Sequence, residues 1–118
     1  MENGWLEREF TNALVDWRRK LDADEWYFAR VRGRLTESLS SEEAFNAIDE
    51  AVLVTLAQDD AFLWTEAMEL MLSLADKSST TEMPPRLRNR WTELIASAAR
   101  FGTYQAKRAE ELRRWYRR

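Results

Sequence analysis

The stretch QDDAFLWTEAMELMLSLAD, residues 58–76, decides the fold of this 118-residue chain. Its apolar side chains recur at the spacing of an α-helix and cover more than half of the helix circumference; they are Leu63, Trp64, Ala67, Met68, Leu70, Met71 and Leu74. A helix that is apolar over so much of its surface is expected to be buried. We therefore predict a helix over residues 60–75, capped by QDD, as the most buried helix of the fold.

A long apolar stripe also runs through the first third of the chain. It continues at helical spacing from Phe10 to Leu35, and Asp24 is the only polar residue on it. Either one long helix spans residues 4–38, or the helix breaks in LDADEW with Asp22 or Asp24 as the N-cap. We favour the break, because a carboxylate on the apolar side of a helix would be buried.

The middle of the chain carries two clear boundary signals. Ser40 and Glu43 have the spacing of a capping box, which predicts a helix over residues 42–57. The polar segment DKSSTTEMPP predicts an exposed loop over residues 76–84.

The last third of the chain predicts two more helices. Pro84 and Pro85 suit the first turn of a helix over residues 86–100, and Gly102 should end it. A last helix should then extend toward the C-terminus.

We expect these helices to form a single all-α domain over residues 1–118. Only three Gly and two Pro leave little material for the tight turns of a β-rich fold. The predicted helices number five or six, depending on the break in the first third of the chain. Taken in pairs, they recur at about the period of HEAT and armadillo repeats. Antiparallel helix pairs are therefore expected, packed either as a short HEAT-like solenoid or as an orthogonal bundle.

The composition excludes most catalytic chemistry. The chain has no Cys and no His, so the commonest general base and the commonest metal ligand are both missing. Glu66 and Glu69 share a helix face, but di-iron bundles need Glu-x-x-His pairs. The sequence shows no glycine-rich phosphate loop and no nucleophile motif. We predict no enzymatic activity, no cofactor and no metal site.

The sequence also indicates no membrane partner. No apolar run approaches the roughly 20 residues that cross a bilayer, and the acidic N-terminus differs from a signal peptide. We therefore expect a cytoplasmic protein.

Charge is distributed unevenly along the chain. Residues 35–76 carry ten acidic residues and no basic one, whereas residues 86–118 carry ten basic and three acidic residues; the net charge is −3. Such asymmetry concerns partners rather than fold. The acidic middle predicts a surface that binds a basic protein partner, and the sequence leaves homo-oligomerisation open.

Each of the two acidic helices carries an apolar residue among its carboxylates. An apolar side chain inside a charged rim is the usual composition of a protein-binding patch. The predicted partner-binding residues are Asp49, Glu50, Leu53, Asp59, Asp60, Phe62, Glu66 and Glu69. In the alternative interpretation, the apolar residues carry no function, and the carboxylates pair inside the domain with Arg86, Arg90 or Arg100.

A nucleic-acid-binding module is the alternative from another functional class. The C-terminal sequence KRAEELRRWYRR combines arginines with aromatic residues, which together can grip phosphates and stack on bases. The arginines concerned would be Arg86, Arg90, Arg113, Arg114 and Arg117. Helical spacing argues against this alternative, because the aromatic residues share one face, as core residues do. That face consists of Tyr104, Ala109, Leu112, Trp115 and Tyr116.

The stretch LAQDDAFLWTEAMELMLSLAD, residues 56–76, resembles a segment of small helical, HEAT-like immunity proteins of bacterial polymorphic toxin systems. In that family an Asp closes one helix and a Glu begins an amphipathic run, and Asp60 and Glu66 fall at matching positions. Phe62 and Thr65 stand where the family has histidines. The resemblance implies inhibition of a toxin by occlusion. We therefore expect an immunity-type inhibitor that covers a basic toxin or nuclease with its acidic helical face.

Overall fold

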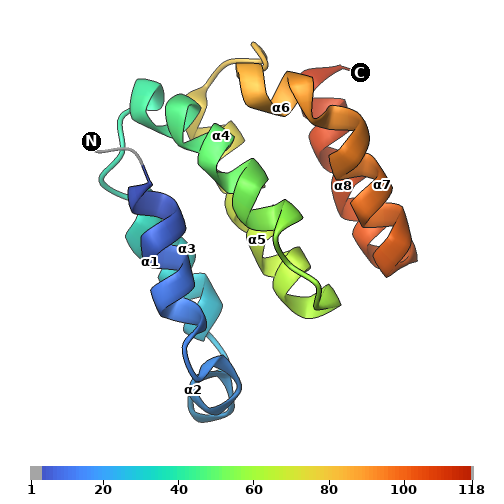
Figure 1. Ribbon diagram of the computed structural model, residues 1–118. Helices are drawn as coiled ribbons and strands as arrows, with labels where there is room; N and C mark the ends of the chain where they lie inside the picture. Colours follow the sequence, from blue (N-terminus) through green and yellow to red (C-terminus); the bar gives the residue numbers. More distant parts are fainter. Residues whose placement is uncertain (1–3, 118) are drawn as a thin grey trace.

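The computed structural model describes residues 4–117, which form eight α-helices and no β-strand (Figure 1). In chain order they are α1 (Trp5–Leu14), α2 (Trp17–Ala23), α3 (Tyr27–Thr36), α4 (Ser41–Leu56), α5 (Ala61–Ser78), α6 (Pro85–Asn89), α7 (Trp91–Phe101) and α8 (Thr103–Tyr116). The prediction of an all-α fold is confirmed. The predicted number of five or six helices is too low, because two of the predicted helices are each divided by a break.

The helices lie as neighbouring pairs on both sides of a central pair. α4 and α5 form the central pair and pack along most of their lengths. α1 and α3 lie on one side of it, and α7 and α8 lie on the other (Figure 1). The short helix α6 contacts α4 and α7. The Cα radius of gyration is 13.5 Å, as expected for a compact chain of this length.

Side-chain caps determine where the two central helices begin. The Ser40 hydroxyl accepts a hydrogen bond from the N–H of Glu43 at 3.1 Å, and the Glu43 carboxylate accepts one from the N–H of Ser40 at 2.9 Å. Before α5, Asp60 Oδ1 accepts a hydrogen bond from the N–H of Leu63 at 3.0 Å. Each cap satisfies N–H groups that the first turn of a helix leaves free. Both predicted helix starts are confirmed.

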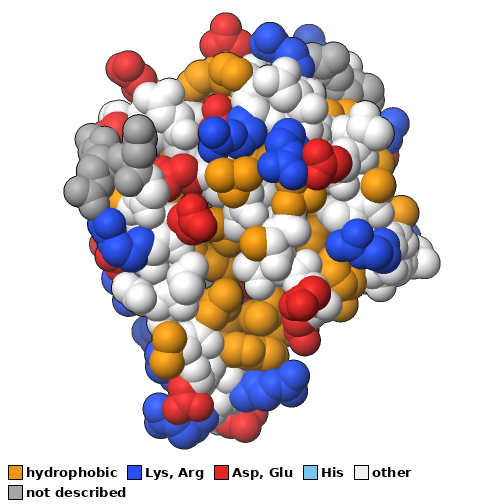
Figure 2. Space-filling model, in the orientation of Figure 1, with side chains coloured by type: hydrophobic (Ala, Val, Ile, Leu, Met, Phe, Trp, Pro, Cys, Tyr) orange, Lys and Arg blue, Asp and Glu red, His pale blue; other side chains and the backbone are white. Residues whose placement is uncertain are grey.

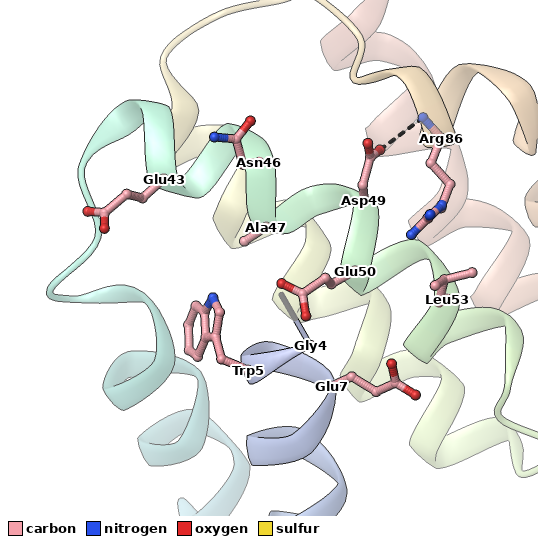
Figure 3. Close-up of a pocket in the computed structure, with 10 residues that line it drawn as sticks. All are labelled: Gly4, Trp5, Glu7, Glu43, Asn46, Ala47, Asp49, Glu50, Leu53 and Arg86. Atoms are coloured by element: carbon pink, nitrogen blue, oxygen red, sulfur yellow. Dashed lines mark hydrogen bonds between the residues drawn. The ribbon is translucent and has the colours of Figure 1, made fainter. Parts of the chain in front are cut away.

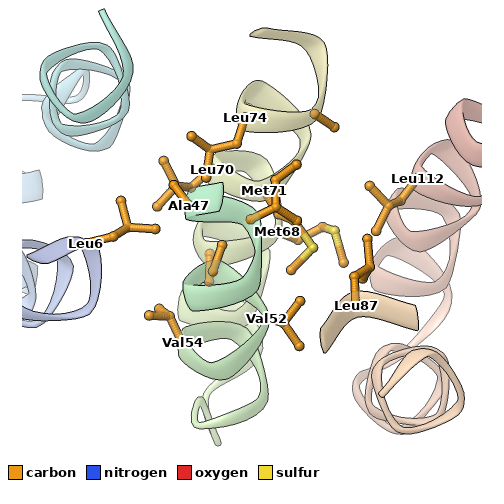
Figure 4. Close-up of a cluster of buried hydrophobic side chains, with 14 of the residues drawn as sticks. Leu6, Ala47, Val52, Val54, Met68, Leu70, Met71, Leu74, Leu87 and Leu112 are labelled. Carbon is orange, nitrogen blue, oxygen red and sulfur yellow. The ribbon is translucent and has the colours of Figure 1, made fainter. Parts of the chain in front are cut away.

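The core is built around α5. This helix buries nine residues, more than any other helix in the described part of the chain: Trp64, Thr65, Ala67, Met68, Leu70, Met71, Leu74, Ala75 and Ser78. Leu6 of α1 approaches the central pair from one side, and Leu87 and Leu112 approach it from the other (Figure 4). The prediction that this helix is the most buried is therefore confirmed.

The first third of the chain forms three helices. The predicted break in LDADEW is confirmed, since α2 ends at Ala23 and Asp24 Oδ1 accepts a hydrogen bond from the N–H of Trp26 at 3.0 Å. The sequence does not predict the other break, at Val15 and Asp16. Asp16 adopts the left-handed conformation with a φ of 58°, which Asp tolerates better than most residues. Both residues are exposed, so the apolar periodicity carries no trace of this break.

The segment after α5 is shorter and better anchored than predicted. α5 continues to Ser78, so the loop is only part of the predicted range 76–84. Met83 is buried, and the indole N–H of Trp115 donates a hydrogen bond to the carbonyl of Thr80 at 3.1 Å. The prediction of a wholly exposed loop is wrong, because α8 and the core hold this segment.

The helix predicted over residues 86–100 is divided in two. Pro84 and Pro85 stand at the N-cap and the first position of α6, as predicted. The chain then leaves helical geometry at Arg90, which has a φ of −110° and a ψ of 16°, and α7 follows directly. Gly102 ends α7 with a φ of 138°, a conformation that any side chain would strain.

The predicted core face of the last helix is correct except at one position. Ala109, Leu112 and Tyr116 are buried, and Trp115 is half-buried against the core. Tyr104, in the first turn of α8, is 59% exposed. Its prediction as a core residue is wrong: Tyr104 points to solvent, whereas the next residue, Gln105, donates a hydrogen bond to Thr65 of α5.

Replacing Tyr116 by phenylalanine is expected to raise the free energy of unfolding by about 1 kcal/mol. The Tyr116 hydroxyl is shielded from solvent and has no hydrogen-bond partner among the described residues. Burial, with a smaller contribution from the Asp49 carboxylate, raises the pKa of this phenol. Phenylalanine removes the unpaired polar group and keeps the apolar ring. Urea denaturation followed by circular dichroism measures the change.

Tyr104→Phe provides the matched control for this substitution. The same hydroxyl is removed there from an exposed ring, and the free energy of unfolding should change by less than about 0.5 kcal/mol. A Tyr116→Phe variant that is less stable than the natural chain would contradict the expectation.

Candidate protein-binding cleft

A cleft of about 520 Å³ opens between α1, α4 and α6 (Figure 3). Its lining residues are Gly4, Trp5, Glu7, Glu43, Asn46, Ala47, Asp49, Glu50, Leu53 and Arg86. Trp5 and Leu53 are half-buried and Ala47 is buried, so part of the wall is apolar. The cleft thus joins apolar surface to the acidic face that the sequence predicts on α4.

Among the described residues, four carboxylates and one guanidinium line the cleft. Glu7 comes from α1, Glu43, Asp49 and Glu50 come from α4, and Arg86 comes from α6. Glu7 belongs to a part of the sequence with balanced charge, and the fold brings it to the acidic face. On the surface shown in Figure 2, acidic and basic side chains are otherwise interspersed. The described lining of the cleft therefore has a net negative charge, and apolar walls strengthen its field.

Two of these carboxylates also stabilise the fold. Asp49 Oδ1 accepts hydrogen bonds from the backbone N–H groups of Arg86 at 3.1 Å and Leu87 at 3.2 Å, and so caps α6 (Figure 3). Glu43 belongs to the capping box, and the hydrogen bond from the N–H of Ser40 lowers the pKa of its carboxyl group. These two side chains add charge to the cleft while their oxygens are partly engaged.

Glu50 has an unpaired carboxylate oxygen within the fold. Its Oε1 is shielded from solvent and accepts no hydrogen bond from the described residues. Figure 3 shows its side chain extending from α4 toward α1, near Trp5 and Glu7. A shielded polar atom without a partner costs free energy. No hydrogen bond within the described part of the chain offsets that cost.

Three of the eight predicted partner-binding residues lie in this cleft: Asp49, Glu50 and Leu53. The other five lie on α5 or just before it and do not line the cleft; they are Asp59, Asp60, Phe62, Glu66 and Glu69. The structure therefore divides the predicted acidic face into two separate groups.

Two carboxylates of α5 are paired within the chain. Glu66 Oε2 lies 2.6 Å from Arg32 Nη1, and the two side chains are only 15% and 26% exposed. Glu69 forms an ion pair with Arg108 of α8. The alternative prediction of pairing inside the domain is right for these two residues, although their partners are other arginines than those predicted.

The Glu66–Arg32 pair joins α3 to α5. Removal of the carboxyl group from water raises the pKa of Glu66; the nearby Glu69 carboxylate adds to this shift, and Arg32 opposes it. Removing one partner of an ion pair that is largely shielded from solvent is costly, because the other charge is left unpaired. We conclude that Glu66 connects two helices and offers no free charge.

The remaining predicted residues of this group lie near the start of α5. Asp60 caps α5, and its other carboxylate oxygen lies 4.0 Å from Arg18. Phe62 is 39% exposed and stacks on Trp17 with 5.2 Å between the ring centroids. Asp59 is exposed, and its side chain forms no hydrogen bond or ion pair with the described residues. The stacking on Trp17 accounts for the position of Phe62 without requiring a partner.

Several arginines of the nucleic-acid alternative already have acidic neighbours. Arg90 donates hydrogen bonds to Glu93 at 2.6 and 3.0 Å, and Arg113 lies 3.3 Å from Glu110. Arg86 lies in the acidic cleft. The other arginines that the sequence singles out, Arg100, Arg114 and Arg117, are exposed.

The sequence-based prediction did not include seven residues of the cleft: Gly4, Trp5, Glu7, Glu43, Asn46, Ala47 and Arg86. Part of the signal was available, because helical spacing places Glu43, Asn46, Glu50 and Leu53 on one face of α4. No local pattern indicates that Trp5 of α1 would pack beside that face.

Within residues 4–117, no three or more acidic side chains are arranged to hold a metal ion. None of the helices in that range is both long enough and apolar enough to span a bilayer. Comparison of the chain with protein-family models, with curated proteins and with solved structures found no match. The chemistry of the cleft is therefore the basis for inferring a function.

Proposed function

We propose that this chain is a stoichiometric protein-binding domain whose cleft between α1, α4 and α6 accepts a basic segment of a partner protein. The observation that carries this proposal is the convergence of four carboxylates on a partly apolar cleft. Protein interfaces combine an apolar centre with a polar rim, and opposite charge speeds encounter. Trp5 and Leu53 supply the apolar centre, and Glu7 and Glu50 supply charge at its edge.

The specific form that we propose is an immunity-type inhibitor, which occludes a basic toxin or nuclease. The resemblance of residues 56–76 to HEAT-like immunity proteins supports this form. The succession of helix pairs α1/α3, α4/α5 and α7/α8 is compatible with a short HEAT-like solenoid. An inhibitor of this kind works by covering its partner, so it needs a complementary surface and no catalytic groups.

Co-expression with the products of neighbouring genes tests the proposal. We expect one product to be toxic when produced alone, and to purify with this chain in a complex of fixed stoichiometry. The double variant Glu7→Lys/Glu50→Lys should weaken that complex at least about tenfold, mainly through slower association, because it reverses the charge of the cleft. Surface plasmon resonance measures both rate constants.

Asp22→Lys/Glu25→Lys is the matched control, because it makes the same change in net charge at exposed side chains around the α2–α3 turn. Its affinity should stay within about twofold of that of the natural chain, since exposed charges away from an interface contribute little. An equal loss of affinity in both double variants would show general electrostatic attraction and would argue against the cleft.

A salt series with generic duplex DNA and RNA tests the nucleic-acid alternative. We expect weak binding, because Arg90 and Arg113 are paired with acidic residues and Arg86 lies in an acidic cleft. Submicromolar binding that falls steeply with salt would instead support that alternative.

A further inference from the structure

We propose that the cleft selects an arginine side chain of its partner over a lysine, with the guanidinium held between the Trp5 ring and the Glu50 carboxylate. This inference rests on the proposed function, since it specifies which basic group enters the cleft. It depends on three features of the cleft: an unpaired carboxylate, an aromatic wall and an excess of negative charge.

The first feature is the Glu50 carboxylate, which lines the cleft and forms no hydrogen bond or ion pair with the other described residues. The Arg86 guanidinium also lines the cleft but forms no ion pair with Glu50. A carboxylate in this position interacts strongly with an incoming cation, because water screens it incompletely. Guanidinium offers parallel N–H groups that match the two oxygens of a carboxylate, whereas ammonium acts as a point charge.

The aromatic wall favours the same cation. Trp5 lines the cleft beside Ala47, and Leu53 adds apolar surface. A planar guanidinium stacks on an indole ring and gives up its hydration more readily than an ammonium group. A cleft with partly apolar walls therefore penalises lysine more than arginine.

The excess of negative charge leaves room for a second cation beside Arg86. Of the side chains described between residues 4 and 117, four carboxylates line the cleft against this one guanidinium. Figure 3 shows the Arg86 side chain on the α6 side, whereas Trp5 and Glu50 lie toward α1. Thus Arg86 does not occupy the position proposed for the arginine of the partner.

Isothermal titration calorimetry of the full chain with three tetrapeptides tests the inference. Tetra-arginine should bind at least about tenfold more tightly than tetra-lysine, and tetra-citrulline, which keeps the shape but lacks the charge, should not bind measurably. Glu50→Gln should weaken tetra-arginine binding about tenfold. Glu25→Gln, which removes the same charge at an exposed position, should change it by less than about twofold.

A third variant, Trp5→Leu, isolates the contribution of the ring. It should reduce the preference for tetra-arginine over tetra-lysine to less than about threefold, because the aliphatic side chain cannot stack on the cation. Circular dichroism verifies that this variant is folded. If it is not, the peptide comparison and Glu50→Gln decide the question.

The outcomes distinguish this inference from the proposed function. Equal affinities for tetra-arginine and tetra-lysine, both reduced by Glu50→Gln, would overturn arginine selection and leave the binding of a basic partner intact. Peptide affinities that are unaffected by Glu50→Gln would overturn the inference and also count against the cleft as the binding site.

Discussion

Trp64→Ala is expected to lower the free energy of unfolding by about 3–5 kcal/mol. Trp64 is the largest fully buried side chain of the described residues and lies in the most buried helix. Its indole N–H donates a hydrogen bond to the hydroxyl of Ser97 at 3.0 Å, and its ring packs against Phe101. Alanine would leave a cavity between α5 and α7. A domain of this size has only about 5–15 kcal/mol in total, so the loss is severe.

Guanidinium denaturation followed by far-ultraviolet circular dichroism measures this effect independently of tryptophan fluorescence. Trp26→Ala is the matched control: the Trp26 side chain is 62% exposed, so the same substitution should cost less than about 0.5 kcal/mol. If Trp64→Ala does not fold, Trp64→Phe should still fold with a loss of about 1–3 kcal/mol, because much of the ring volume remains. Equal stabilities of Trp64→Ala and Trp26→Ala would contradict the assignment of the core.

The double reversal Glu66→Lys/Glu69→Lys is expected to destabilise the fold by about 1–3 kcal/mol for each ion pair. The sequence alone leads to a different prediction. It places both residues on a polar strip of the helix, so that reversing their charges would leave the fold intact and weaken partner binding. In the structure, each lysine would instead face a partly buried arginine, Arg32 or Arg108. Thermal denaturation with circular dichroism measures the loss.

Two comparisons define the cause of that loss. Asp22→Lys/Glu25→Lys makes the same change in net charge at exposed positions, and its cost should remain below about 1 kcal/mol. Adding Arg32→Glu to Glu66→Lys should restore part of the stability, because the pair then forms with its charges exchanged. A double reversal as stable as its control would show that these ion pairs contribute nothing to the fold.

The sequence by itself determined the fold class and the features that depend on neighbouring residues. The capping box at Ser40 and Glu43, the cap at Asp60 and the burial of α5 were all predictable. Each depends on residues within one or two helical turns, where the 3.6-residue period brings side chains together. The break in LDADEW was predictable for the same reason, because a carboxylate interrupts the apolar stripe.

Tertiary structure alone decided which of the acidic residues remain free. Glu66 and Arg32 are 34 positions apart, and only the packing of α3 against α5 brings them within 2.6 Å. Similarly, Asp49 caps α6 across 37 positions, and Trp5 and Glu50 line the same cleft because α1 packs on α4. A helical pattern shows which side of a helix faces outward, but long-range pairing depends on which helix covers that side. The local sequence therefore predicts an acidic face, and helix packing decides that Glu66 and Glu69 are paired within the chain while Asp49, Glu50 and Leu53 line the cleft between α1, α4 and α6.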